Sequence, residues 1–119
     1  MKNSNKETGN KGEDIAAEWL LQQGFVLLER NWRYSHWEVD IIASKNNKLH
    51  FIEVKTRNSH RYGKPEESFD KNKMNALQNA AEQYQHQHPE WKKIQFDIVA
   101  ITLQRDAVTE IFLIEDVYI

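Results

Sequence analysis

The feature that most constrains the fold is a pair of strand-like runs on either side of a short polar turn. The run WEVDIIA, from Trp37, alternates polar and apolar residues with the period of a β-strand, and LHFIEVKT, from Leu49, returns as a second strand. Asn46 and Asn47 stand between the two runs, and asparagine tolerates the positive φ angles that a two-residue hairpin turn requires. The sequence therefore predicts an antiparallel hairpin over residues 37–56.

Acidic residues occupy positions of this hairpin where a buried strand would carry apolar side chains. Pairing is symmetric about a turn at 46–47, so Asp40 is expected to face Glu53. By the same register Glu38 faces Lys55, and side-chain alternation puts all four residues on one face. Like charges directly opposite each other destabilise a sheet, so the acidic pair requires a proton, a neighbouring cation or a bound metal. Two carboxylates at this separation can hold Mg²⁺ beside the lysine, and the alternative is a solvent-exposed strand face with cross-strand salt bridges.

Two other segments show the spacing of amphipathic helices. The first runs over about residues 10–23, and Gly24 follows where a glycine commonly ends a helix. The second runs over residues 70–87 and is followed by Pro89. The apolar stripes that we predict are Ile15, Ala16, Trp19 and Leu20 in the first helix, and Met74, Leu77, Ala81 and Tyr84 in the second.

The remaining pattern completes an αβββαββ order. Residues 58–69 contain Gly63 and Pro65 and predict a loop. Short turns favour antiparallel neighbours, whereas the second helix can cross over to a parallel strand. We therefore predict one α/β (or α+β) domain over residues 1–119, with a mixed sheet of about five strands flanked by helices and a loose polar segment at 1–8. The further strands cover residues 25–30, 94–103 and 108–114.

Composition excludes some classes of site and suggests a cytoplasmic protein. The chain has no cysteine, so it forms no disulfide and no thiolate metal site. Its beginning shows no apolar signal segment, and its apolar runs are far shorter than the roughly 20 residues that span a bilayer, so we expect no membrane partner. The net charge is −2, but residues 55–73 are locally basic. Such a stretch either faces phosphate or is an ordinary solvated loop.

The acidic hairpin resembles a known nuclease signature. Asp40, followed on the next strand by Glu53-Val54-Lys55, resembles the PD-(D/E)xK motif. The wider pattern resembles the small bacterial YraN family of predicted endonucleases, which is related to archaeal Holliday junction resolvases. A lone ExK is a weak signal, whereas the whole ordered set is specific for the family. The matching pieces are GNKGEDIAAEWL, GFVLLERNWR, EVDIIA, FIEVKTR, Gly63, Lys73, Ala80, Tyr84 and FDIVAI.

The resemblance implies a fold and a chemistry. The implied fold is a restriction-endonuclease-like core, a mixed sheet with a helix on each side. Asp40 and Glu53 would be metal ligands for Mg²⁺, with Mn²⁺ as a substitute, and Lys55 would be the catalytic lysine. Glu13 would be an additional acid on the first helix, and Glu38 belongs to the family's usual Glu-x-Asp.

The implied activity is metal-dependent hydrolysis of DNA phosphodiester bonds. Branched DNA or DNA with single-stranded regions is the substrate class that the resolvase relationship suggests. Cutting two strands needs two active sites, so the same relationship implies a homodimer. The alternative function is a non-catalytic module on the same fold that binds nucleic acid or a partner protein.

The other candidate residues also have structural interpretations that involve no function. Glu13 lies three residues after Asn10 and is either the N3 partner of a capping box or an acid that points toward the sheet. The family commonly has glycine where this chain has Trp37, and a tryptophan does not allow an equally close approach of a ligand. The polar residues that we expect to contact DNA are otherwise typical of solvated surfaces. They are Arg57, Arg61, Lys64, Lys73 and, more weakly, Gln78.

Overall fold

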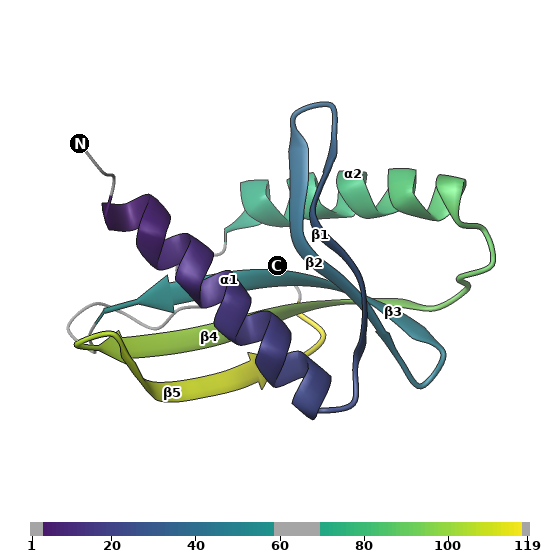
Figure 1. Ribbon diagram of the computed structural model, residues 1–119. Helices are drawn as coiled ribbons and strands as arrows, with labels where there is room; N and C mark the ends of the chain where they lie inside the picture. The colour runs from purple at the N-terminus through teal and green to yellow at the C-terminus, as the bar shows by residue number, and fades with distance from the viewer. Residues whose placement is uncertain (1–3, 59–69, 118–119) are drawn as a thin grey trace.

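The structure is a computed structural model that describes the backbone of residues 4–58 and 70–117, and within these ranges the side chains from Lys11 onward. Helices and strands follow one another in the predicted order αβββαββ (Figure 1). In this part of the chain, no helix is both long enough and apolar enough to cross a membrane. The elements are α1 Ser4–Gln22, β1 Val26–Tyr34, β2 Trp37–Lys45, β3 Lys48–Arg57, α2 Lys71–Gln87, β4 Ile94–Gln104 and β5 Ala107–Ile114.

The five strands form one mixed sheet in the spatial order β1-β2-β3-β4-β5. β3 and β4 are parallel, and the other three neighbouring pairs are antiparallel. α2 connects the two parallel strands, as a crossover helix does. The predicted mixed sheet and the predicted role of the second helix are both confirmed.

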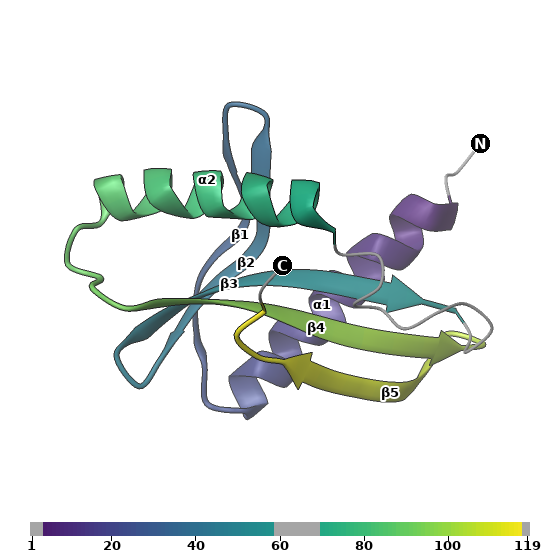
Figure 2. The same cartoon turned by 180° about the vertical axis from the view of Figure 1, so that it is seen from behind.

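The two helices cover opposite faces of the sheet, as the views in Figures 1 and 2 show together. On one face, α2 buries Leu77 and Tyr84 against Phe51 of β3. On the other face, α1 buries Leu20 against Ile52 of β3. Because consecutive side chains of a strand point to opposite faces, β3 is apolar on both sides along its first half. The helical stripes predicted from the sequence are the surfaces that pack against the sheet.

The central hairpin has the predicted turn. Asn46 and Asn47 adopt φ angles of 54° and 63°, as a type I′ turn requires. Five residue pairs follow the predicted register, from Lys45 opposite Lys48 to Ile41 opposite Ile52.

The expected pairing beyond those five pairs is wrong. The ladder between β2 and β3 ends at Ile41 and Ile52, so Asp40 is not paired with Glu53, and Glu38 is not paired with Lys55. β2 separates from β3 at this point while it continues to pair with β1. The acidic residues therefore lie where the sheet divides.

The first helix differs from its predicted bounds. α1 begins at Ser4, so the polar residues 4–8, which we expected to be loose, form its first turns. Among these residues, Lys6 and Glu7 have high intrinsic helix propensity. Glu13 therefore lies well inside the helix, and its interpretation as a capping-box residue is wrong. Gly24 follows the helix with a φ angle of 95°, which confirms its predicted place after the helix end.

Candidate active site

Asp40 lies at the point where β2 leaves β3. Its Oδ2 accepts a hydrogen bond of 2.8 Å from the backbone N–H of Val54. The carboxylate thus takes the place of a strand partner, because the ladder has already ended at Ile41. Burial, and then the charge of nearby Glu53, raise the pKa of Asp40 to about 8, although the hydrogen bond from Val54 opposes the shift.

Glu53 is the second acid of the site and contacts two lysines. Its Oε2 lies 3.1 Å from Lys73 Nζ and 3.5 Å from Lys55 Nζ. The Glu53 side chain is only 14% exposed, so these contacts are partly shielded from solvent. Within the described residues, neither lysine forms an ion pair with Asp40. Both lysines of the site therefore contact Glu53 and not Asp40.

The two lysines respond differently to this environment. Burial lowers the pKa of Lys55, and neighbouring Lys73 lowers it further. Burial also acts to lower the pKa of Lys73, but its contacts with Lys55 and Glu53 outweigh burial, so the pKa of Lys73 is raised. Lys73 therefore holds its proton more firmly than Lys55 does.

The start of α2 fixes the position of Lys73. Asp70 is the N-cap residue, and its Oδ1 accepts a hydrogen bond of 3.0 Å from the backbone N–H of Lys73. This contact satisfies one of the free N–H groups at the helix start. Lys73 then points its ammonium group at Glu53, on the strand that precedes the crossover.

Glu13 approaches the site from α1. Its side chain is 18% exposed, and its Oε1 lies 3.9 Å from Arg30 Nη2 on β1. Burial raises the pKa of Glu13, whereas a hydrogen bond with Asn31 and the charge of Arg30 act against the rise. The Glu13 charge in turn contributes to the raised pKa of Asp40. The three acids thus interact electrostatically, although Glu13 belongs to the opposite layer.

A depression of about 390 Å³ adjoins the acidic pair. Glu38 lines it and forms an ion pair of 3.2 Å with Arg33. Trp37 is not a lining residue, because it alternates to the other face of β2 from Glu38. Trp37 therefore does not fill this depression. The lining residues are Glu38, Asp40, Glu53, Asn72, Lys73, Ala76 and Leu77.

The remaining predicted residues are not all brought to the acidic pair. Arg57 is half-buried at the end of β3. Gln78 is exposed on α2 and does not line the depression. Arg61 and Lys64 lie outside the described residues. Among the predicted DNA contacts, the structure thus places Lys73 at the site.

Sequence reasoning missed several residues that position this site. Asp70 caps α2, Asn72 lines the depression, and Arg30 lies between Glu13 and Asp14. Asp70 carried a signal, because an aspartate directly before an apolar helical stripe is a common N-cap. The sequence gives no signal for the contacts of Arg30, because these contacts depend on how α1 crosses β1.

The donor set at Asp40 and Glu53 fits a hard divalent cation. Among the side chains of residues 11–58 and 70–117, no group of three or more histidine, aspartate or glutamate residues lies close enough together to hold one metal ion. Two carboxylates are nevertheless sufficient for Mg²⁺, which commonly takes one or two protein carboxylates and fills its other positions with water and phosphate oxygens. The raised pKa of Asp40 means that its surroundings disfavour the ionised carboxylate, which a bound cation would stabilise.

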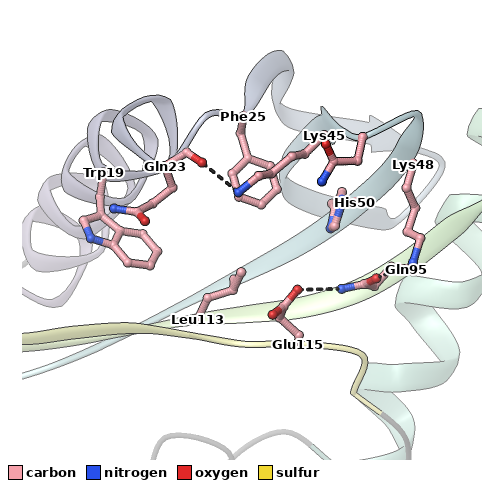
Figure 3. Close-up of a pocket in the computed structure, with 10 residues that line it drawn as sticks. Trp19, Gln23, Phe25, Lys45, Lys48, His50, Gln95, Leu113 and Glu115 are labelled. Atoms are coloured by element: carbon pink, nitrogen blue, oxygen red, sulfur yellow. Dashed lines mark hydrogen bonds between the residues drawn. The ribbon is translucent and has the colours of Figure 1, made fainter.

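A second cavity lies at the other end of β3 from the acidic pair. It has a volume of about 370 Å³ and is lined by Trp19, Phe25, Lys45 and Glu115, among others (Figure 3). Lys45 donates a hydrogen bond of 2.7 Å to the backbone oxygen of Gln23 and lies over the ring of Phe25. Its ammonium group therefore already has partners within the protein.

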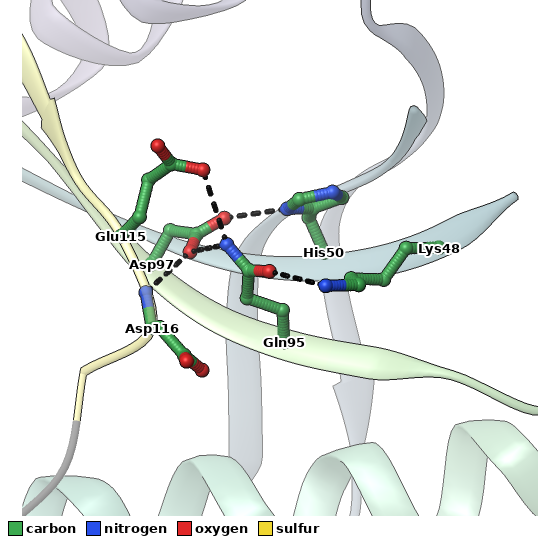
Figure 4. A network of polar contacts seen from close by, with 6 residues as sticks. All are labelled: Lys48, His50, Gln95, Asp97, Glu115 and Asp116. Atoms are coloured by element: carbon green, nitrogen blue, oxygen red, sulfur yellow. Dashed lines mark hydrogen bonds and ion pairs between the residues drawn. The ribbon is translucent and has the colours of Figure 1, made fainter. Parts of the chain in front are cut away.

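A buried polar network supports this cavity (Figure 4). Asp97 is fully buried, and its Oδ2 lies 2.6 Å from His50 Nδ1. Its Oδ1 accepts hydrogen bonds from Gln95 Nε2 at 2.8 Å and from the backbone N–H of Asp116 at 3.0 Å. Gln95 also accepts a hydrogen bond from Lys48. These contacts make Asp97 a structural hydrogen-bond acceptor.

Fold and site together define the class of this protein. A five-stranded mixed sheet with a helix on each face, divided at a pair of acids, is a restriction-endonuclease-like α+β core. Residues 12–101 match the Uncharacterised protein family UPF0102, and the chain belongs to this family, which is the YraN-like family that the motifs indicated.

Curated relatives support the assignment along nearly the whole chain. A protein of Dictyoglomus thermophilum is 45% identical over 103 residues, which are 86% of this chain and 87% of the relative. A protein of Chloroherpeton thalassium is 39% identical over 124 residues, covering 98% of this chain and 96% of the relative. A protein of Rhodococcus opacus is 35% identical over 115 residues, covering 96% and 98%. All three are called UPF0102 protein, a name that states no activity.

Proposed function

We propose that this protein is a Mg²⁺-dependent deoxyribonuclease that hydrolyses phosphodiester bonds within DNA. The observation that carries the proposal is the acidic pair Asp40 and Glu53 at the division of the sheet, with Lys55 and Lys73 against one member of the pair. Two acids and a lysine at one place suit phosphodiester hydrolysis, because this reaction requires charge stabilisation at the phosphate and an oriented water molecule.

Each side chain has a role in this proposal. Asp40 and Glu53 would hold the cation, which would supply charge stabilisation at the scissile phosphate. Lys55 positions the attacking water or the scissile phosphate as a hydrogen-bond donor. Lys73 adds a second positive charge that attracts the DNA backbone. Glu13 supplies further negative charge toward the cation from the opposite layer.

We also propose that the substrate is branched or partly single-stranded DNA and that the protein acts as a homodimer. Two cuts in two strands need two active sites, which a second copy of this chain supplies. β5 lies at the edge of the sheet, and it exposes the apolar side chains of Val108 and Phe112. Light scattering after size-exclusion chromatography measures the oligomeric state directly.

Cleavage of labelled DNA tests the proposed activity. Duplex, single strand, flap and four-way junction are incubated with Mg²⁺, Mn²⁺ or EDTA. We expect metal-dependent cleavage by the wild type, and a loss of about 100-fold or more in Asp40→Asn and in Lys55→Ala. Lys71→Ala is the matched control, because Lys71 is exposed at the start of α2 and does not line the depression.

Two outcomes would contradict the proposal. Cleavage that survives in Asp40→Asn at the wild-type rate would point to a contaminating nuclease. Binding of DNA that is unchanged in EDTA and in both variants, without cleavage of any substrate, would indicate the non-catalytic module instead.

A further inference from the structure

The outer part of the β1–β2 hairpin separates from the rest of the sheet beside the acidic pair. β2 pairs with β3 only as far as Ile41, whereas its pairing with β1 continues to Trp37. Residues 31–40, which we call the hairpin tip, therefore have strand partners only in each other. The hairpin crosses α2 and extends beyond it (Figure 1). Because Asp40 is the last residue of this segment, a molecule held at the acidic pair lies directly beside the hairpin tip.

One face of the hairpin tip is a column of aromatic rings that begins in the core. The ring of Tyr84 meets Phe51 and Trp32 edge-on, with centroid distances of 5.9 and 5.2 Å. Tyr34 lies nearly parallel to Trp32 at 6.4 Å and to Trp37 at 6.2 Å. Such ring pairs attract each other beyond the burial of their area. The column therefore holds Tyr34 in a fixed orientation from the core outward.

The most exposed ring of the column is Tyr34, which lies between Trp32 and Trp37. Tyr34 is 41% exposed, whereas Trp32 and Trp37 are half-buried against the core under α2. A ring that its neighbours already orient loses little conformational freedom when it binds a ligand. Tyr34 is thus suited to contact another flat, apolar surface.

The opposite face of the hairpin tip is charged. Arg33 is paired with Glu38 across the hairpin, as Tyr34 is paired with Trp37, so the two pairs alternate between faces. The Arg33 side chain is 72% exposed and Glu38 lines the depression at the acidic pair. An arginine, an exposed ring and the acidic pair thus lie along one short hairpin.

We propose that the hairpin tip is a wedge that binds an unpaired nucleobase on Tyr34, while the backbone of the same DNA strand passes Arg33 toward the acidic pair. This inference rests on the proposed function, which puts a DNA strand at Asp40. Within a duplex each base is stacked between its neighbours, so only unpaired or splayed bases offer a free π-face to a protein ring. The wedge therefore selects DNA that contains unpaired bases next to the scissile phosphate.

Binding measured in EDTA tests the wedge without any cleavage. Fluorescence anisotropy gives the Kd for a DNA duplex and for the same duplex with a three-nucleotide gap, at one fixed low salt concentration. The variant is Tyr34→Leu, which keeps an apolar side chain but removes the π-face, and Tyr34→Phe restores the ring. Val26→Ala is the control, because Val26 is an exposed apolar residue on the same strand, away from the hairpin tip.

We expect the wild type to bind the gapped DNA more tightly than the duplex. Tyr34→Leu should lose about tenfold in affinity for the gapped DNA and less than about twofold for the duplex, since stacking on one base is commonly worth that much. Tyr34→Phe and Val26→Ala should bind both DNAs as the wild type does. A 2-aminopurine base in the gap should be quenched by the wild type and not by Tyr34→Leu.

The results separate this inference from the proposed function. Metal-dependent cleavage by a wild type that does not prefer the gapped DNA, or equal losses of Tyr34→Leu on both DNAs, would overturn the wedge and leave the nuclease standing. Selective binding of the gapped DNA with no cleavage under any condition would support the wedge and overturn the nuclease. Absence of DNA binding in every condition would overturn both.

Discussion

The Asp40 carboxylate accepts a hydrogen bond from the backbone N–H of Val54 at the first position where β2 and β3 no longer pair. A side-chain oxygen of β2 thus accepts a hydrogen bond from β3 at a position where the two backbones no longer pair. The same hydrogen bond holds the carboxylate next to Glu53. Asp40 is thus held beside Glu53 at the division of the sheet, where burial and the charge of Glu53 raise its pKa although the hydrogen bond from Val54 opposes the rise.

This relationship predicts that stability falls as the pH rises. The pKa of Asp40 is raised from 3.8 to about 8, so the folded protein binds this proton more tightly than the unfolded chain does. The resulting stabilisation is fully present below about pH 4 and is lost as the pH rises through about 8. In EDTA, Asp40→Asn should be more stable than the wild type at pH 8–9 by at least about 1 kcal/mol. Urea unfolding at one-unit steps from pH 5 to pH 9 measures this difference.

The control for this prediction is Asp106→Asn. Asp106 lies in the turn before β5, and its side chain is 86% exposed. Its variant should follow the wild-type pH profile closely. If Asp40→Asn also followed that profile, the Asp40 carboxyl would titrate alike in the folded and unfolded chains.

A second prediction concerns the cation. A ligand that binds only the folded protein stabilises it by RT ln(1 + [L]/Kd), which is about 1.4 kcal/mol at ten times the Kd. Saturating Mg²⁺ should therefore raise the melting temperature of the wild type by about 3–6 °C at pH 8. Asp40→Asn and Glu53→Gln should show no rise, and Asp106→Asn should show the wild-type rise. An equal rise in Asp40→Asn would mean that Mg²⁺ binds elsewhere.

A third prediction concerns the buried network at the other end of β3. Asp97 is fully buried and is in hydrogen-bonding contact with His50, Gln95 and the backbone of Asp116. Asp97→Ala should destabilise the fold by about 3–5 kcal/mol, because it leaves buried His50 without its partner and removes an acceptor from buried Gln95. Glu115→Ala removes an exposed acid from the same network and should cost less than about 1 kcal/mol. Similar losses in the two variants, measured by urea unfolding, would refute this role of Asp97.

The fold was predictable because its signals are local. The asparagine pair fixed the turn and hence five residue pairs of the hairpin, since a hairpin register follows from its turn. The apolar stripes identified the faces of α1 and α2 that pack against the sheet. The start of α1 at Ser4 was not predictable in the same way, because its first turns carry no apolar stripe.

The candidate site was only partly predictable for a different reason. Register reasoning assumes that two strands continue to pair, whereas β2 leaves β3 at Asp40. The contact of Lys73 with Glu53 joins residues 20 positions apart through a crossover helix, and no local pattern reports such a contact. The approach of Glu13 to the acidic pair likewise depends on how closely α1 lies on the sheet.

The last prediction tests how closely α1 lies on the sheet. A Cβ atom added to Gly12 would overlap the Thr56 Oγ1 atom and would lie 3.0 Å from Thr56 Cβ. Gly12→Ala should therefore push α1 away from β3 and destabilise the protein by about 1–3 kcal/mol, despite the better helix propensity of alanine. Thr56→Ala removes the overlapping oxygen, so the double variant should recover part of that loss. Urea unfolding of the wild type, both single variants and the double variant gives the coupling energy. Additive losses would show that the cost of Gly12→Ala does not come from the Thr56 side chain, so the approach of Gly12 to Thr56 would not be what sets the distance between α1 and β3.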